Sequence, residues 1–293
     1  MWTPVTWEGL SVHQVNKGSD LEKHTKAFIH SVWGSANENI FPGPHPVSIE
    51  RKHIKLVKEN PYVVCEKTDG TRYFLCCTVF EEKKFTIFVN RAFDMFVVPL
   101  AVPRHTMLDG EMVNGKFVIY DAILVNSERI WSCDFITRLK KAEIATRGPP
   151  CSGIKLVMKK MWPLNKFSEL QSQTFDYETD GFIFTPVNEP IKMETHETMF
   201  KWKPLERITV DFIVLKGNLC IWDKYHGMVV TQKLVTKNNE TYENEIVECK
   251  YSNGQWVPIK IRTDKNHPNN RRTLMRTLVN IRENILPCEF QSE

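Results

Sequence analysis

The chain has 293 residues, 42% of them hydrophobic and 25% charged, and its 39 Lys and Arg stand against 35 Asp and Glu. This balance excludes a disordered, collagen-like or low-complexity protein, and the length suits two domains better than one. The formal net charge of +4 permits a polyanionic partner, but only local clustering of charge can indicate one.

The cysteines and the apolar stretches predict an intracellular, soluble protein. Cys76 and Cys77 are adjacent and the other cysteines are scattered without a CxxC pair, so neither a disulfide framework nor a zinc site is indicated. The first ten residues lack the basic and apolar regions of a secretory signal. Residues 95–103 form an apolar stretch that is too short to span a bilayer, so we expect no membrane partner.

The chain opens with an amphipathic helix, predicted over residues 20–33 and capped by Ser19 or Asp20. The proline-rich segment 41–46 predicts a surface loop. From residue 61 onward, short β-rich runs separated by turn residues predict antiparallel sheets. The expected strands cover residues 62–65, 73–80, 85–90, 117–125, 181–185, 199–202, 209–215, 219–222, 228–235, 245–249 and 256–262.

Helical spacing returns over residues 271–285, where Leu274, Leu278, Ile281 and Ile285 share one face. Short strands after residue 209 followed by such a helix suit a small OB-type barrel. We therefore expect an α+β fold in which residues 1–208 form a domain built on antiparallel sheets. Residues 209–293 would form a C-terminal OB-fold domain with a terminal helix.

The segment CEKTDGTR at residues 65–72 carries the first candidate for chemistry. Lys67 lies at the end of an expected strand, just before an Asp-Gly turn, where its side chain can project into a cleft. Its amine could act as a nucleophile if burial or neighbouring cations free the lone pair. Arg72 offers a planar donor fork that suits phosphate or carboxylate. Taken alone, the segment could also be a hairpin turn with ordinary surface charge.

Further charged positions recur in a pattern that fits this lysine. Asp109 and Glu111 are two residues apart, so on a strand they face the same side. Asp121 interrupts an apolar strand, where burial without a partner is costly. Each pattern alone is also typical of a solvated sheet face. Together, a lysine, carboxylates for a metal or ribose, and cations for phosphates are the parts needed to attack a nucleotide α-phosphate.

Six motifs in this order resemble the covalent nucleotidyltransferases, which comprise mRNA capping guanylyltransferases and polynucleotide ligases. The motifs are KTDGTR at Lys67, DGE at Asp109, YDA around Asp121, TDGFIF at Asp180, FKWKP at Lys201 and RTDK at Arg262. Asp180-Gly, where ligases usually have Glu-Gly, and the RTDK form favour capping over ligation. The segment FPGPHPVSIER at residues 41–51 is similar to the short two-domain capping enzymes of fungi and large DNA viruses.

The resemblance implies that residues 1–208 form a nucleotidyltransferase domain in which Lys67 attacks the α-phosphorus of GTP and expels pyrophosphate. The bound GMP would then pass to the 5′-diphosphate end of an RNA and form a GpppN cap. It further implies a metal ligand in Asp180, for Mg²⁺ or Mn²⁺, and catalytic roles for Arg72, Lys201, Lys203, Arg262, Asp264 and Lys265. The implied GTP-binding residues are Arg91, Asp109, Glu111, Tyr120, Asp121 and Lys159, of which Tyr120 would stack on guanine and Lys159 would read the base.

The implied partners are nascent RNA, a separate RNA triphosphatase and the C-terminal tail of RNA polymerase II, in the nucleus for a cellular member. Independently of the family, a basic cluster predicts a polyanionic contact, with a solvated helix start as the alternative. This cluster between residues 258 and 276 comprises Lys260, Arg262, Lys265, Arg271, Arg272 and Arg276. Two alternatives remain for the whole chain: an ATP-dependent polynucleotide ligase that uses the same lysine, and a non-catalytic module that binds RNA ends.

Overall fold

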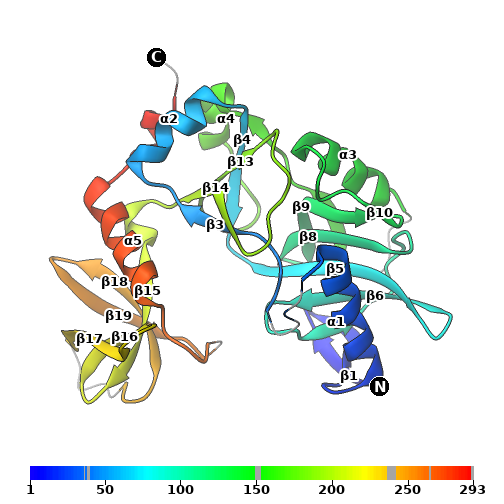
Figure 1. Cartoon of the computed structure of the whole chain (residues 1–293), viewed down its shortest axis with the longest axis horizontal. Helices are drawn as coiled ribbons and strands as arrows, with labels where there is room; N and C mark the ends of the chain where they lie inside the picture. The colour runs from blue at the N-terminus through cyan, green and yellow to red at the C-terminus, as the bar shows by residue number, and fades with distance from the viewer. Residues whose placement is uncertain (36, 38–39, 149–152, 236–241, 264, 292–293) are drawn as a thin grey trace. The chain divides into compact units, whose positions relative to one another are not determined.

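The computed structural model describes residues 1–293 except for 36, 38–39, 149–152, 236–241, 264 and 292–293 (Figure 1). The chain divides into two compact units. The first comprises Met1–Val47, Leu56–Lys201 and Gln291–Glu293, and the second comprises Ser48–Lys55 and Trp202–Phe290. The domain boundary that the sequence suggests, at residue 208, stays a prediction. Among the described residues, no helix combines the length and the apolar character that a membrane span requires.

A nine-stranded sheet forms the larger part of the first unit (Figure 1). All of its neighbouring strands are antiparallel except β11, which pairs with β9 in parallel. In spatial order the strands are β1 (Trp2–Trp7), β2 (Leu10–Val15), β7 (Met95–Val97), β6 (Lys83–Asn90), β5 (Thr71–Phe80), β8 (Thr106–Val113), β9 (Lys116–Val125) and β10 (Glu128–Arg129), with β11 (Lys155–Met158) on β9.

Both faces of this sheet are buried. Successive side chains of a strand point to opposite sides, so neighbouring residues belong to different cores. On β5, Leu75 belongs to one hydrophobic core and Phe74 belongs to another. The core of Leu75 includes Ala142 of helix α3 (Phe135–Ala145), and the core of Phe74 includes Leu21 of helix α1 (Asp20–Trp33). One helix therefore covers each face, and the central strands are nearly continuous runs of apolar residues.

A second sheet, of five strands, supplies the end of β4 at which Lys67 lies. Its order is β12 (Trp162–Pro163), β4 (Tyr62–Thr68), β13 (Thr179–Pro186), β14 (Thr195–Trp202) and β3 (His45–Ser48). The short helices α2 (Arg51–Glu59) and α4 (Phe167–Gln171) complete the described elements in this part of the chain, with 3₁₀ turns at Leu164–Lys166 and Leu205–Arg207.

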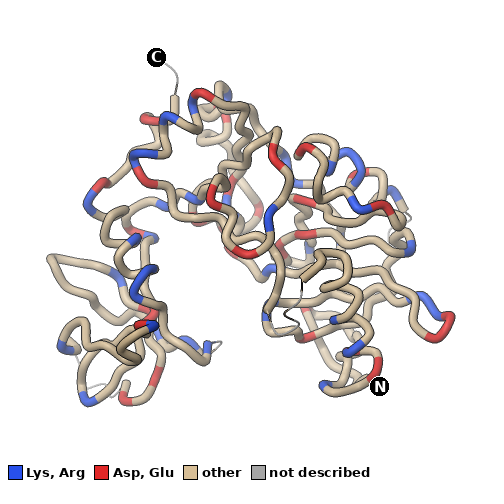
Figure 2. Tube along the Cα trace, viewed as in Figure 1, with Lys and Arg blue, Asp and Glu red and all other residues tan. Residues whose placement is uncertain are grey.

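The C-terminal strands form a separate five-stranded antiparallel sheet, followed by helix α5 (Arg271–Glu283) and a 3₁₀ turn at Pro287–Phe290. The amide of Gln232 joins its two outer strands, because it donates to the carbonyl of Trp256 at 2.9 Å and accepts from the same residue's N–H at 2.8 Å. Leu274 of α5 packs into the core of this sheet, and arginines recur along the same helix (Figure 2). The order is β17 (Gly227–Lys233), β16 (Asn218–Asp223), β15 (Thr209–Leu215), β18 (Ile246–Ser252) and β19 (Gln255–Ile261).

The expected fold class is confirmed: antiparallel sheets with few helices, and a five-stranded C-terminal domain that ends in a helix. The helix expected over residues 20–33 is also confirmed as α1, and the Ser19 side chain accepts from the backbone N–H of Glu22 at 3.3 Å. The surface loop expected over residues 41–46 is wrong: residues 41–44 lie outside helices and strands but are buried, and residues 45–46 begin strand β3. The Phe41 ring stacks on Phe74 with centroids 4.2 Å apart, and this contact holds the segment against the core.

Candidate active site

One pocket in the first unit is lined by seven of the fourteen predicted site residues. Strands β4, β5, β8 and β9 all contribute side chains to its wall. Of the predicted site residues, the pocket is lined by Lys67, Arg72, Arg91, Glu111, Tyr120, Asp121 and Lys159. Pro44 and Pro46 of the proline-rich segment line it as well. Residues that are separated by more than ninety positions in the chain thus share a single cavity.

A β-bulge directs Asp180 at Lys67. Strands β4 and β13 pair antiparallel, with Thr179 opposite Thr68 and Phe182 opposite Glu66. Asp180 and Gly181 therefore stand together across from Lys67, which is the two-against-one count of a bulge. The Gly181 φ angle of 146° is one that side-chain-bearing residues rarely adopt. As a result, the Lys67 Nζ donates to the Asp180 Oδ1 at 2.7 Å, and its side chain remains 25% exposed toward the pocket.

Arg72 is fixed by a carboxylate behind the pocket wall. The β5–β8 register sets Arg72 opposite Glu111, so Asp109 is the next residue on the same face. Arg72 donates through Nε to Asp109 Oδ1 at 2.9 Å and through Nη2 to Asp109 Oδ2 at 2.5 Å. Its Nη1 donates to the carbonyl of Pro44 at 2.6 Å. Both side chains of the ion pair are buried, so the guanidinium is held rigidly at the pocket wall.

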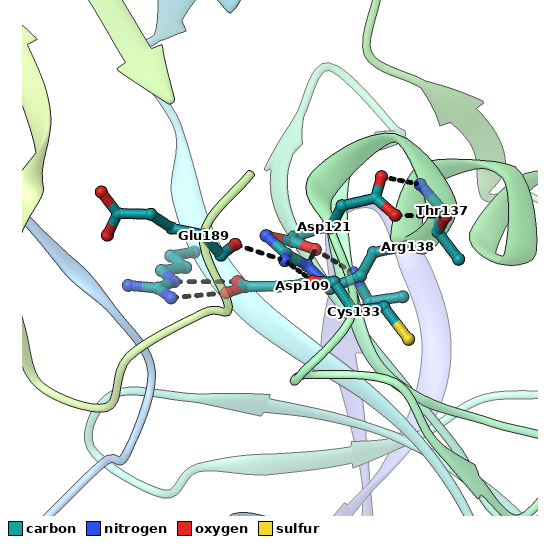
Figure 3. Close-up of polar contacts among 9 residues, drawn as sticks. Asp109, Asp121, Cys133, Thr137, Arg138 and Glu189 are labelled. Carbon is teal, nitrogen blue, oxygen red and sulfur yellow. Dashed lines mark hydrogen bonds and ion pairs between the residues drawn. The ribbon is translucent and has the colours of Figure 1, made fainter. Parts of the chain in front are cut away.

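Asp121 has a buried partner that the motifs do not include, Arg138 of α3. Arg138 donates through Nε to Asp121 Oδ1 at 2.8 Å and through Nη2 to Asp121 Oδ2 at 3.0 Å. Its Nη1 also donates to the carbonyls of Cys133, at 2.6 Å, and Glu189, at 3.2 Å (Figure 3). The ion pair therefore joins strand β9, which also carries Tyr120, to helix α3 and to the chain around Glu189.

Lys159 is tied to both neighbours of Lys67. Its Nζ donates to the Thr68 Oγ1 at 2.5 Å and to the backbone carbonyl of Glu66 at 2.9 Å. It also pairs with the Glu66 carboxylate at 3.1 Å, and the hydroxyl of Tyr177 donates to that carboxylate at 2.7 Å. These contacts hold the end of β4, and with it the backbone position of Lys67.

The pocket lining contains four cationic side chains, those of Lys67, Arg72, Arg91 and Lys159, and two carboxylates, those of Glu111 and Asp121. Burial raises the pKa of Glu111 above its usual value, and the nearby charges of Lys67, Arg72, Lys159 and Arg91 act against that shift. Burial likewise raises the pKa of the Tyr120 phenol, which therefore stays protonated at neutral pH. Cations that outnumber the available carboxylates favour a ligand with several negative charges.

Two histidines of the same unit are held neutral. Burial lowers the pKa of His45 to about 4, with a further contribution from the charges of Arg91, Arg72 and Lys201. Burial also lowers the pKa of His196 to about 4, with a further contribution from Lys192. The His196 side chain is almost fully buried, and its Nδ1 lies 3.2 Å from the Thr198 Oγ1. The charge of Lys201 therefore acts on His45 together with the charges of Arg91 and Arg72.

We expect His196 to make the protein less stable as the pH falls. Between its folded pKa and the value of about 6.5 in the unfolded chain, the unfolded state binds more protons, so stability is lost on acidification. The free energy of unfolding should fall by about 2 kcal/mol between about pH 7 and pH 5 through this residue. Urea unfolding of wild type and His196→Gln over that range measures the effect. The same pH slope in both proteins would contradict the assignment.

Of the predicted residues that are described and not yet placed, all but Lys201 belong to the second unit. Arg262 donates through Nη1 to the Asp211 Oδ1 at 3.0 Å, and Lys265 forms an ion pair with the same carboxylate. Lys203 also belongs to this unit, whereas Lys201 ends the first. Asp264 lies outside the described residues. Asp211, which the motifs do not include, therefore holds the two cations of the RTDK motif.

Asp180, which adjoins the pocket through Lys67, fits a metal that is bound together with phosphates. Within the described residues, no group of three or more His, Cys, Asp and Glu side chains is arranged to hold a metal. Mg²⁺, however, is usually held by one or two carboxylates together with substrate phosphates and water. Asp180, next to Lys67, could supply one such carboxylate. The donor set is therefore compatible with an ion that depends on a nucleotide for its other ligands.

Sequence reasoning missed Glu66, Arg138 and Asp211, which each hold a predicted residue. Their positions carry a weak signal at most. A buried Asp121 requires a cation, but the sequence offers many lysines and arginines and does not say which one lies nearby. Glu66 is next to Lys67 in the chain, so the sequence indicates only another charged residue near the Asp-Gly turn and not a partner for Lys159.

Comparison with known proteins gives one consistent family. Residues 7–205 match the family model described as mRNA capping enzyme, catalytic domain, and residues 174–289 match mRNA capping enzyme, C-terminal domain. The mRNA-capping enzyme of Mus musculus is 32% identical over 282 residues, which cover 80% of this chain and 46% of the mouse protein. That of Danio rerio is 28% identical over 316 residues, which cover 92% of this chain and 52% of the zebrafish protein.

A fungal relative matches over more of its own length. The mRNA-capping enzyme subunit alpha of Schizosaccharomyces pombe is 25% identical over 346 residues, covering 95% of this chain and 85% of the yeast protein. The chain thus spans about half the length of the two vertebrate relatives and most of the yeast subunit.

Proposed function

Because the chain belongs to the mRNA capping enzyme family, we propose that it is an mRNA guanylyltransferase that acts through a lysyl–GMP intermediate on Lys67. GMP would be taken from GTP and passed to the 5′-diphosphate end of an RNA, forming a GpppN cap. The observation that carries this proposal is the position of Lys67, a partly exposed amine at the wall of a cation-lined pocket, oriented by Asp180.

In the first step, the lone pair of the Lys67 Nζ forms a bond to the α-phosphorus of GTP. The bond from that phosphorus to the bridging oxygen of the β-phosphate breaks, and pyrophosphate leaves. The ammonium loses one proton before the attack, which frees the lone pair, and a second as the phosphoramide forms, so the product nitrogen keeps one. Asp180, which accepts a hydrogen bond from this nitrogen, is placed to receive a proton. Arg72, held rigidly by Asp109, presents a preorganised positive charge to the phosphates.

The same pocket offers groups for the nucleoside. Glu111, opposite Arg72, would accept from the ribose hydroxyls, and Tyr120 would stack on guanine. Lys159 would read the base, although its contacts with Glu66 and Thr68 show that it also supports the β4 end. Arg91 lines the pocket beside these groups and would bind phosphate or ribose. A divalent ion held by Asp180 and the phosphates would neutralise charge as pyrophosphate forms.

The second unit would complete the site for the leaving group. Arg262 and Lys265 are held by Asp211, and we propose that they exchange this carboxylate for the β- and γ-phosphates when the C-terminal domain closes over GTP. Lys201 and Lys203 would contact the α-phosphate, and Asp264 would act with the RTDK cations. Reopening near residue 208 would then admit the RNA. We expect a separate RNA triphosphatase and the polymerase II tail as partners, in the nucleus for a cellular member.

Nucleotide choice tests the proposal. The protein is incubated with Mg²⁺ or Mn²⁺ and either labelled GTP or labelled ATP, and covalent label is measured after denaturation. We expect GTP to label the protein and 5′-diphosphate RNA to remove the label as a cap. Label from ATP alone would indicate a ligase, and no label from either nucleotide would indicate a non-catalytic module.

A further inference from the structure

The end of β16 and the turn that follows it present two aromatic rings to solvent. The Trp222 side chain is 47% exposed and Tyr225 is 84% exposed. Both belong to the second unit, and neither is among the residues to which the proposed reaction assigns a role. Rings this exposed do not stabilise a core, so a role in binding would explain their position better than packing does.

Asp223 gives this turn a fixed shape. Its carboxylate accepts from the backbone N–H groups of Tyr225, at 2.9 Å, and His226, at 3.0 Å, and its Oδ1 lies 2.9 Å from the His226 Nδ1. These contacts lower the pKa of Asp223 to about 2, and the side chain is only 7% exposed. Asp223 is the one acidic residue of segment 222–228, and its carboxylate is occupied by these contacts. It therefore does not repel an anionic ligand that binds to the rings.

The turn is joined to the basic cluster that the sequence singles out. The Trp222 N–H donates to the carbonyl of Asn269 at 3.1 Å, and Trp222 forms a β-bridge with Asn270, the N-cap of α5. Arg271, the first residue of α5, lies 3.4 Å from the Asp223 Oδ2 with its side chain 60% exposed. The ammonium of Lys224 lies 5.8 Å from the centroid of the Tyr225 ring. Exposed cations therefore flank the rings, and Figure 2 marks basic residues at the start of α5.

We propose that Trp222 and Tyr225 form a stacking platform for single-stranded RNA, with Lys224 and Arg271 contacting its phosphates. The rings would stack on successive bases of the acceptor transcript, which is the RNA of the proposed function on which this inference rests. Aromatic rings combined with flanking cations are the general means of binding single strands without regard to sequence. Met228, which pairs with Trp222 across the β16–β17 register, is 39% exposed and adds apolar surface beside the rings. The cations Lys224 and Arg271 at the same place favour a polyanion with stacking bases over a purely apolar protein partner.

Direct RNA binding tests the platform. Fluorescence anisotropy with a labelled 5′-diphosphate RNA of about 15 nucleotides, without GTP, measures the Kd of wild type and of Trp222→Ala/Tyr225→Ala. We expect the Kd to rise by at least about 30-fold in the double variant, because two stacked bases are lost and each contributes on the order of 1–3 kcal/mol. The variant Trp222→Phe/Tyr225→Phe, which keeps the rings, should bind nearly as wild type does.

Two further variants test whether a loss of RNA affinity is specific to the rings. Ile144→Ala removes an apolar side chain that is 61% exposed on α3, far from these cations in the chain, and should leave the Kd unchanged. Tyr225→Ala alone removes a ring that is too exposed to support the fold and should still weaken binding. An unchanged Kd in the alanine variants, as expected for a protein-docking turn, would overturn the platform, and so would an equal loss in Ile144→Ala.

The outcome is separable from that of the proposed function. GMP labelling with GTP is measured on the same preparations and does not require RNA. Loss of RNA affinity in a protein that never accepts GMP would support the platform and contradict the guanylyltransferase. Normal GMP labelling with unchanged RNA affinity would support the enzyme and overturn the platform.

Discussion

Lys67→Ala is expected to abolish covalent labelling by GTP, reducing it by at least about 10⁴-fold. A methyl group has no lone pair with which to attack phosphorus, and loss of a nucleophile of this kind is not compensated by the groups that remain around it. The fold should persist, because the Lys67 side chain lies at a strand end and is partly exposed. Mass spectrometry of the labelled protein, with assignment of the modified peptide, measures the result.

Lys67→Arg is the matched control for charge. Arginine keeps a cation that can pair with Asp180, but its guanidinium stays protonated and is a poor nucleophile. We expect this variant to bind GTP without forming the adduct, which would separate binding from chemistry. An adduct that persists in Lys67→Ala, or that maps to another peptide in wild type, would show that a different residue is the nucleophile.

The roles of the predicted site residues stay predictions, but several of these residues lie close together because their positions follow local strand geometry. The alternation that put Asp109 and Glu111 on one face is a property of any strand, and the structure places both next to Arg72. Lys67 and Asp180, by contrast, meet only because a bulge inserts a residue opposite the lysine. Alternation alone does not indicate such an insertion, although Gly181 after an aspartate is consistent with one.

What could not be predicted depends on long-range packing. Phe41 follows the composition of a loop, yet its ring is buried because Phe74, on a strand thirty-three residues later, offers a surface to stack on. The strands β1 and β2 and helix α3 were not predicted either, since their patterns are short or mixed. The partners of the buried charges depend on the same contacts, and Arg138 reaches Asp121 only after α3 packs on β9.

Arg138→Met is expected to lower the free energy of unfolding by about 3–5 kcal/mol. Arg138 is 1% exposed and Asp121 is 3% exposed, so removing the cation leaves a carboxylate buried without its counter-charge. The carbonyls of Cys133 and Glu189 lose a donor at the same time. Urea unfolding of both proteins at neutral pH measures the difference.

The pH dependence of this loss identifies its cause. Burial already raises the pKa of Asp121, and Arg138 is the main group that opposes the shift, so the pKa should rise further in the variant. A folded-state pKa above the unfolded value means that the native protein binds more protons, so the variant should regain stability relative to wild type as the pH falls. Asp121→Leu/Arg138→Met should recover part of the loss, because it removes the buried charge while the carbonyls stay without a donor. A deficit that is independent of pH and unchanged in the double variant would show that lost packing, and not the unpaired carboxylate, destabilises the protein.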